Sequence, residues 1–502
     1  MKKRFLNSGI SVALIMMTIA CSNSPVKVCP TNSHYLFYKD KPLILITSDH
    51  HYGAIIDLDF DFNKYLEYLA DNGMNLTRIY PGGMFEPPDK YLPGNPLGPR
   101  PGRQLLPWLK SDQTGANPVL AEPGKPSCKY DLDKWNPDYF ARLKAFVELA
   151  SKKDIIVEIP FFNGMYADCW PLMAMYHGNN IQNAGQYEMQ DCGLFTTLDD
   201  RNREVVSYQK AYIKKIVTEL NSYDNLIFDI CDEPSLQGLP DGNITVNPDS
   251  MIIPWINAMK DAFLDAEESL PEKHLLGQTV QNLSPDLSDE AWCAWLPAEY
   301  VAPSERALKL DYKKNKPIIN VETNYFGISL TKSLYDVDAV RLEGWWFLLG
   351  GGAGLINLNG EYFRGQESGG SKTQTQIVPQ KKILKEFINR FDLAGLLRFT
   401  DFSITSEAAY SNGLSESGKQ YAFYLFHGKP DSEWGSSFVP EHDNYLDTLT
   451  INTIPSGSYL AEWIDPTSGA VKGSENVSCK DGNLKLITPP YSLDIALRIV
   501  RF

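Results

Sequence analysis

Residues 225–234 of this 502-residue chain read NLIFDICDEP and contain the strand that decides the fold. The apolar run, rich in β-forming side chains, predicts a buried strand over residues 226–231. Asp232 and Glu233 follow directly, at the point where that strand stops. Pro234 has no N–H to offer a strand ladder, so we expect the chain to turn there. In a barrel of parallel strands, this carboxyl end carries the functional groups.

A second apolar run ends in the same way. Residues 316–322 read KPIINVE, which predicts a strand over residues 318–321 followed by Glu322. The ends of parallel barrel strands meet at one rim, so Glu233 and Glu322 can be held about 5 Å apart. Two carboxyl groups at that spacing can serve as proton donor and nucleophile on a glycosidic bond. The alternative at each position is a salt bridge or a loop carboxylate.

Strands alternate with helices up to about residue 395. Besides the two runs above, strands are predicted at residues 43–47, 74–80, 155–159, 274–279, 353–358 and within 291–301. Apolar residues at helical spacing predict helices over residues 62–72, 137–149, 205–220 and 337–349. This order predicts an α/β chain with a (β/α)8 TIM barrel. A doubly wound sheet is the alternative, but no GxGxxG or P-loop motif follows a strand.

From about residue 399 the pattern changes to short strands separated by turn residues. Residues 421–426, 448–451, 459–463 and 493–502 read as strands, and no helical pattern occurs among them. This predicts a small all-β sandwich after the barrel. The domains expected are a signal peptide at 1–20, a tether at 21–33, the barrel at 34–395 and a β-sandwich accessory domain at 396–502.

Three segments resemble the clan A glycoside hydrolases, a cellulase-like superfamily of (β/α)8 barrels. Residues 73–78 (GMNLTR) are similar to the second strand of that clan, and residues 316–322 to its nucleophile strand. Asp232-Glu233-Pro234 is similar to the Asn-Glu-Pro of its acid/base strand. The resemblance covers about residues 35–395. The tail, with EWIDPTSG at residues 462–469, resembles the β-sandwich appended to many such bacterial enzymes.

The resemblance implies a retaining glycosidase that acts on a poly- or oligosaccharide without a cofactor. Glu233 would be the acid/base, Glu322 the nucleophile, and Arg78 the residue that supports the nucleophile. Asp232 departs from the clan pattern, because an asparagine usually stands there and bonds the 2-hydroxyl of the sugar. An ionised aspartate can accept that bond but cannot donate one. A second carboxylate beside Glu233 would raise the pKa of Glu233, as an acid catalyst needs.

Further candidates for substrate binding follow other predicted strands. Arg78 can hold Glu322 ionised through a bidentate pair, or it can form an ion pair with another barrel carboxylate. The remaining candidates near strand ends are His50, His51, Asn163, Gln278, Tyr325, Asn359 and Glu361.

Two other functions remain open. Aspartate in place of asparagine is compatible with a non-catalytic, carbohydrate-binding lipoprotein on a glycosidase-like barrel. The adjacent His50 and His51 allow a metal-dependent hydrolase, although neighbouring side chains on a strand point in opposite directions. We expect no metal.

The N-terminus reads as a targeting segment. Basic residues 2–4 precede an apolar run at 9–20 that is too short to span a membrane as a mature helix. Residues 18–21 (TIAC) resemble the lipobox of bacterial lipoproteins, which implies cleavage before Cys21 and lipidation of its thiol. The chain would then be lipid-anchored in a bacterial cell envelope, at an outer membrane. An ordinary secretory signal is the alternative.

Composition limits the partners. The formal net charge of −15 disfavours nucleic acid and anionic membranes, so we expect a carbohydrate partner, membrane contact only through the anchor, and a monomer. Seven cysteines follow Cys21 without a CxxC pair, which argues against zinc and redox motifs. Cys169 and Cys192 flank one loop and are the pair most suited to a disulfide.

Overall fold

Eight parallel strands form a ring in the first part of the chain. The computed structural model describes residues 24–48, 52–84, 86–88, 90, 98–238, 243–280, 284–299, 311–323, 337–357, 361–406, 409–430 and 438–502. The ring strands are β4 (Leu45–Ile46), β5 (Leu76–Arg78), β8 (Ile156–Tyr166), β9 (Leu226–Gly238), β11 (Leu275–Gly277), β12 (Leu296–Glu299), β13 (Ile318–Glu322) and β14 (Gly354–Leu355).

Parallel ladders and two single junctions close this ring. Ladders join β5 to β8, β9 and β11 in turn, and join β12 to β13, β14 and β4. A bridge between Gly277 and Trp295 connects β11 to the segment entering β12. Asn75 connects β4 to β5, because its N–H donates to the carbonyl of Ile46 at 3.1 Å. The ring is the barrel that the sequence predicts, and it leaves no edge strand of the kind a doubly wound sheet has.

Helices surround the ring, and four of them lie where the sequence predicts a helix. The described helices are α1 (Phe62–Asp71), α2 (Pro137–Lys152), α3 (Arg203–Leu220), α4 (Asp249–Glu268), α6 (Val337–Leu349) and α7 (Val378–Ile388). Sequence periodicity did not predict α4 and α7. Between β11 and β12, residues 284–292 form turns instead of a helix. Of the helices within the described ranges, none combines the length and hydropathy needed to cross a bilayer.

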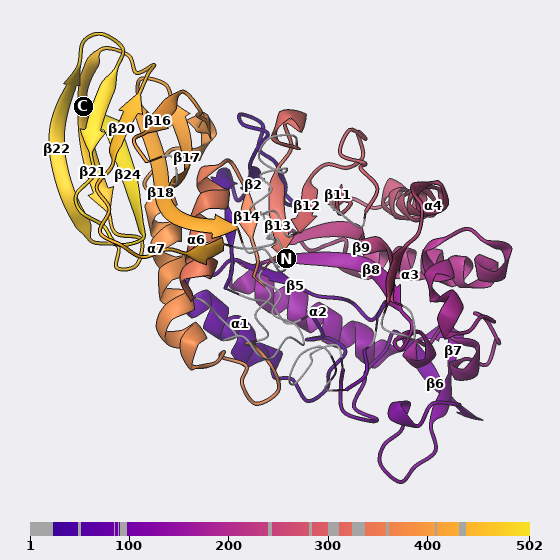
Figure 1. The fold of residues 1–502 in the computed structure, drawn as a ribbon. Coiled ribbons are helices and arrows are strands. Elements are labelled where there is room, and N and C mark those ends of the chain that lie inside the picture. The colour runs from indigo at the N-terminus through magenta and orange to yellow at the C-terminus, as the bar shows by residue number, and fades with distance from the viewer. Residues whose placement is uncertain are drawn as a thin grey trace, which may run out of the picture.

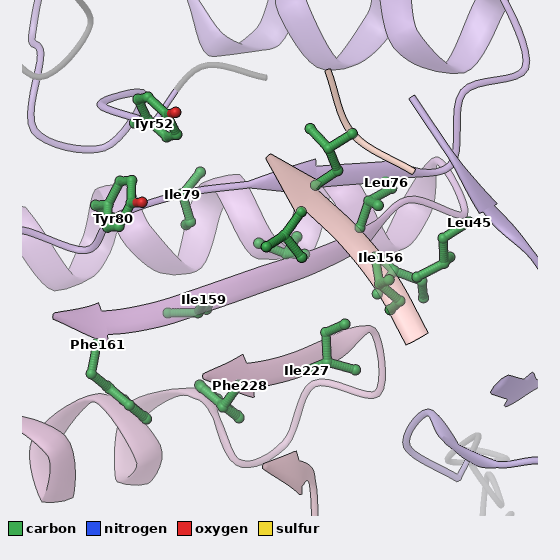
Figure 2. Packing of buried hydrophobic residues seen from close by; sticks show 14 of the residues in the cluster. Leu45, Tyr52, Leu76, Ile79, Tyr80, Ile156, Ile159, Phe161, Ile227 and Phe228 are labelled. Atoms are coloured by element: carbon green, nitrogen blue, oxygen red, sulfur yellow. The ribbon is translucent and has the colours of Figure 1, made fainter. Parts of the chain in front are cut away.

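Apolar side chains from neighbouring strands fill the barrel interior (Figure 2). Leu45, Leu76, Ile156 and Ile227 come from four different ring strands, and all are fully buried. On the outer side of the ring, Phe228 stacks on Phe161 with ring centroids 5.2 Å apart. This packing supplies the rigid base on which the polar residues of the opposite end are held.

Strand β9 continues past Pro234, contrary to the expected turn. Its ladder with β8 pairs Asn163 with Asp232 and then Met165 with Gln237, so the residues in between bulge out of the register. Pro234 lies in this bulge, where its missing N–H costs no ladder bond. Beyond the bulge, β9 pairs with β10 (Ile244–Val246). The sequence therefore predicted the position of the irregularity but not that the strand resumes.

Two segments outside the ring also take regular structure. The predicted tether is in part folded, because β1 (Lys27–Val28) pairs with β2 (Leu36–Tyr38), which in turn pairs with β3 (Lys41–Leu43). The long loop after β5 contains β6 (Trp108–Thr114), which forms a hairpin with β7 (Cys128–Trp135).

The C-terminal segment contains only strands among its described residues. One sheet holds β15 (Leu397–Arg398), β17 (Ala409–Glu416), β18 (Gln420–Pro430), β19 (Phe438–Pro440), β21 (Gly457–Ile464), β22 (Val471–Cys479) and β24 (Asp494–Arg501). The other holds β16 (Phe402–Ile404), β20 (Thr448–Ile451) and β23 (Leu484–Ile487). Phe423, Leu449, Leu486 and Leu497 from the two sheets share one apolar core.

Helix α6 lies between the barrel and these sheets (Figure 1). All of its residues except Asp338 are buried, whereas an ordinary barrel helix exposes one face. On the C-terminal side, Trp345 stacks on Tyr424 with ring centroids 5.4 Å apart. Arg341 forms a buried ion pair with Asp494 at 2.8 Å. The two parts of the chain therefore share one continuous interface.

The seven described cysteines are all free thiols, so the expected pair of Cys169 and Cys192 does not form a disulfide. The Sγ of Cys192 instead lies 3.2 Å from the carbonyl oxygen of Met165. Six of the seven are buried, which fits their use as small apolar side chains.

Candidate active site

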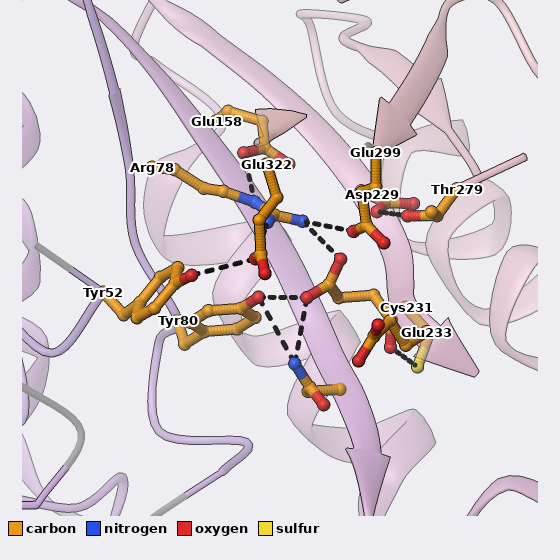
Figure 3. Close-up of polar contacts among 12 residues, drawn as sticks. Tyr52, Arg78, Tyr80, Glu158, Asp229, Cys231, Glu233, Thr279, Glu299 and Glu322 are labelled. Atoms are coloured by element: carbon orange, nitrogen blue, oxygen red, sulfur yellow. Dashed lines mark hydrogen bonds and ion pairs between the residues drawn. The ribbon is translucent and has the colours of Figure 1, made fainter. Parts of the chain in front are cut away.

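Arg78 is the centre of a cluster of carboxyl groups at the carboxyl end of the ring (Figure 3). It ends β5 and is fully buried. Its Nε lies 2.7 Å from Glu158, and one terminal nitrogen lies 2.7 Å from Asp232. The other terminal nitrogen lies 3.6 Å from Glu322. The contact with Glu322 is a single approach and not the expected bidentate pair, whereas the alternative, ion pairs with other barrel carboxylates, is present at shorter distances.

Asp232 is held entirely by protein donors. Arg78 donates to its Oδ1, while Asn163 donates to Oδ2 at 2.9 Å and Tyr80 donates to the same oxygen. Only 2% of Asp232 is exposed. The pKa of Asp232 is lowered, because the charge of Arg78 and the hydrogen bonds outweigh the effect of burial, which acts in the opposite direction. Asp232 is therefore a buried, fixed anion.

Glu322 ends β13 and reaches open space. Its side chain is 12% exposed, and Oε2 accepts a hydrogen bond of 2.9 Å from Tyr52. Arg78 approaches the same oxygen. Tyr52 and Arg78 together orient one carboxylate oxygen, an arrangement that prepares a carboxylate to act as a nucleophile.

Glu233 lies in the β9 bulge with a left-handed backbone, at φ 43°. Few non-glycine residues adopt this conformation, and those that do cluster at functional sites. The residue is partly exposed, and Tyr166 donates to its Oε2 at 3.4 Å. Its pKa is raised well above the ordinary value, first by burial and then by the charges of Asp232 and Glu322. The effect that the sequence predicts for Asp232 is present but is not the largest.

Three further carboxyl groups belong to the cluster and were not predicted as site residues. Glu158 on β8 and Asp229 on β9 are fully buried, and Glu299 at the end of β12 is 3% exposed. Burial raises the pKa of Glu158 to about 8 and that of Asp229 to about 7. A charged residue inside an apolar strand run was the available signal for Glu158 and Asp229. The sequence offered no such signal for Glu299, because the residues around it show no clear strand pattern.

Two tyrosines of the site were also missed. Tyr52 and Tyr80 follow β4 and β5, and their hydroxyl groups reach Glu322 and Asp232. The rings pack against each other with centroids 4.9 Å apart. Tyrosines are frequent in this chain, so residue type alone could not single them out.

Among the described residues, one set of carboxyl groups is close enough to hold a cation. Oxygen atoms of Asp232, Glu299 and Glu322 lie within 4.8 Å of one another. The guanidinium of Arg78 already lies 2.7 Å from Asp232, 3.9 Å from Glu299 and 3.6 Å from Glu322, and it supplies positive charge at this position. A divalent ion would have to compete with it, so we assign no metal to the set.

The other predicted site residues lie in different places. Asn163 belongs to the cluster through Asp232. Gln278 is fully buried and donates to the carbonyl of Cys231 at 2.8 Å. Glu361 is buried after β14, where it accepts from the N–H of Gly370 and the hydroxyl of Thr373. The residues that fall outside the described part of the chain are Cys21, His50, His51, Tyr325 and Asn359.

Comparison of the sequence with protein-family models and with curated proteins finds no match. Solved structures do match the fold. A structure described as a glycoside hydrolase aligns over 95% of this chain and 97% of its own, with a TM-score of 0.58 and 12% identity. A putative glycoside hydrolase from Bacteroides vulgatus ATCC 8482 aligns over 95% and 82%, with a TM-score of 0.59 and 13% identity.

A third similar structure is a glycoside hydrolase family 5 protein from the same organism. It aligns over 95% of this chain and 94% of its own, with a TM-score of 0.57 and 12% identity. At such low identity the likeness concerns the fold. The chain has the α/β fold of these (β/α)8-barrel glycoside hydrolases.

Proposed function

We propose that this chain is a retaining glycoside hydrolase of an oligo- or polysaccharide, with Glu233 as acid/base and Glu322 as nucleophile. The observation that carries the proposal is a difference in exposure. Six carboxyl groups surround Arg78, and four of them are at most 3% exposed: Glu158, Asp229, Asp232 and Glu299. Only Glu233 and Glu322 reach open space, so they are the pair available to a substrate.

The first step forms a glycosyl–enzyme bond. The carboxylate of Glu322 attacks the anomeric carbon, and the bond from that carbon to the leaving oxygen breaks. Glu233 gives its proton to the leaving oxygen, which departs as an alcohol. The raised pKa of Glu233 supports this role, because the group remains protonated at a pH where an ordinary glutamate is ionised.

The second step returns the enzyme to its starting state. Glu233, now ionised, takes a proton from a water molecule, whose oxygen attacks the anomeric carbon. The bond to Glu322 breaks, and the product keeps the anomeric configuration of the substrate. Arg78 and Tyr52 stabilise the negative charge that forms again on the carboxylate of Glu322.

The test begins with a screen of purified protein against plant and microbial polysaccharides and aryl glycosides. On a substrate that is cleaved, Glu322→Ala should lower kcat by at least about a thousandfold, and added azide should restore turnover with inverted product. Glu148→Ala, on the exposed side of α2, is the control and should leave the rate unchanged. Undiminished hydrolysis by Glu322→Ala would overturn the assignment.

A non-catalytic, carbohydrate-binding role is the second candidate. Asp232, in the position where an asparagine would bond a sugar hydroxyl, favours it, because its oxygens are already occupied by protein donors. Binding of a glycan by calorimetry, with no product after prolonged incubation, would support this role over catalysis.

We further propose that the protein is a lipid-anchored monomer of a bacterial cell envelope. The support is the lipobox-like TIAC sequence at residues 18–21. Expression with a labelled fatty acid should label the wild-type chain and leave Cys21→Ser unlabelled. Equal labelling of both would contradict the anchor.

A further inference from the structure

Glu299 is a buried carboxyl group for which the proposed reaction gives no role. It ends β12 beside Glu322, its register partner on β13. Only 3% of the residue is exposed. Within the described part of the chain, no hydrogen-bond donor reaches its Oε1. A buried carboxylate oxygen without a donor is costly, so the protonation state of Glu299 needs an explanation.

The neighbouring Asp232, in contrast, has several hydrogen-bond donors. It receives hydrogen bonds from Arg78, Tyr80 and Asn163. The guanidinium nitrogen that lies 2.7 Å from Asp232 is 3.9 Å from Glu299. Three donors therefore reach Asp232, and the arginine nitrogen that they include lies farther from Glu299.

Carboxylate oxygens of Asp232 and Glu299 lie within 4.8 Å of each other, and two buried carboxyl groups at such a separation disfavour each other's ionisation. The groups that face Glu299 are Arg78 on β5, Cys231, Asp232 and Glu233 on β9, and Glu322 on β13. Arg78 provides the one positive charge among them. Since Asp232 holds the donors, the shared proton belongs on Glu299.

We propose that Glu299 is a positioning residue that stays protonated and donates its O–H to the ionised Asp232. The inference rests on the proposed function for its catalytic consequence, but the protonation state stands by itself. Burial and the charge of Asp232 both raise the pKa of Glu299, which agrees with the contact geometry. A neutral Glu299 leaves the charge of Arg78 to Asp232 and Glu322.

This pair also accounts for the aspartate before Glu233. A carboxylic acid that donates to a carboxylate carries one negative charge in total, as an asparagine beside a carboxylate would. The charge is thereby placed on the strand that carries Glu233, directly under the acid/base. If Glu299 ionised as well, repulsion would act on Asp232, Glu233 and Glu322 together.

Substitutions at position 299 test whether Glu299 acts as a hydrogen-bond donor to Asp232 or as a negative charge. Glu299→Gln keeps the size and provides an N–H for Asp232, so kcat/KM should fall less than tenfold. Glu299→Leu removes the donor, and we expect a loss of about a hundredfold, mainly in kcat. Asp232→Asn is the matched isosteric variant of the partner, and it should cost more than Glu299→Gln, because three donors lose their anion. A Glu299→Gln loss as large as that of Glu299→Leu would overturn the proposal.

Infrared spectroscopy tests the proton directly and needs no substrate. The C=O stretching band of protonated carboxylic acids in the wild type should lose one component in Glu299→Gln. The component should shift, but remain, in Asp232→Asn. An unchanged band in Glu299→Gln would show that Glu299 is ionised and would refute the proposal. A wild type without hydrolytic activity that still shows the expected band would contradict the proposed function alone.

Discussion

Arg78 determines how charge is distributed in the site. It is one guanidinium among six carboxyl groups, and its three nitrogens face three different strands. A planar, delocalised cation can serve several acceptors at fixed angles, which the ammonium of a lysine cannot. The arginine is therefore a structural requirement of the cluster as well as a support of Glu322.

Arg78→Lys should lower kcat/KM by at least about a hundredfold and also reduce the thermal midpoint. The reason is that a lysine leaves Glu158, Asp232 or Glu322 without its partner in a buried site. Kinetics and thermal unfolding of the purified variant test both effects. Arg201→Lys, at an exposed ion pair with Asp199, is the control and should change neither quantity. Equal behaviour of the two variants would contradict the role given to Arg78.

If Glu233 is the proposed acid, it should set the alkaline limit of activity. The acid must be protonated to assist the leaving group, so the rate should fall as the pH rises through its pKa. Because that pKa is raised above the ordinary 4.5, we expect a rate that stays high well above pH 4.5. The profile of kcat/KM against pH measures this limit. An alkaline limb at the ordinary glutamate value would contradict the assignment of Glu233.

At the scale of single elements, sequence reasoning succeeded where the signal was local. Apolar runs predicted most of the barrel strands, and they indicated Glu233 and Glu322 as candidates because each follows such a run. The course of β9 beyond Pro234 depends on pairing with β8 and β10, which no local pattern contains. The junction between β4 and β5 was likewise not apparent from the sequence, because it depends on the backbone and the side chain of a single residue, Asn75.

Asn75 fastens β4 to β5 through three hydrogen bonds. Its Oδ1 accepts from the N–H of Ile46 at 2.8 Å, and its Nδ2 donates to the carbonyl of Ile44 at 3.0 Å. Asn75→Ala leaves both buried backbone groups unpaired, so unfolding free energy should fall by about 2–4 kcal/mol. Asn72→Ala, which removes a bond within one helical turn, should cost less than about 1 kcal/mol. Urea unfolding measures both, and similar costs would disprove the role of Asn75.

At the scale of the whole molecule, the barrel and the C-terminal sheets act as one folded unit. Asp494 on β24 accepts from Arg341 at 2.8 and 3.1 Å and from Tyr424 at 2.7 Å. The sequence predicted a change of fold class near residue 399, but it could not show that α6 is buried on both sides. That property follows only when β17, β18 and β19 are placed against the helix.

Asp494→Asn should lower the free energy of unfolding by about 3 kcal/mol, because it leaves Arg341 buried with a weakened partner. Glu462→Gln is the matched control in the same sheet. Its ion pair with Arg498 is about one-fifth exposed, and we expect a cost below about 1 kcal/mol. Calorimetric unfolding of both variants gives the comparison. Equal destabilisation would show that the junction is no more important than a surface pair.

The double burial of α6 imposes an order on biosynthesis. The helix follows β13, the strand that carries Glu322, yet its outer apolar face is covered only by strands made much later. During translation, Trp345 and Trp346 stay exposed to solvent until the strands of the C-terminal sheet have left the ribosome, a delay on the order of seconds. Until then the nascent barrel exposes an apolar surface that can associate with other chains. A chain truncated after α7 would therefore leave the outer apolar face of α6 exposed and would be prone to aggregation.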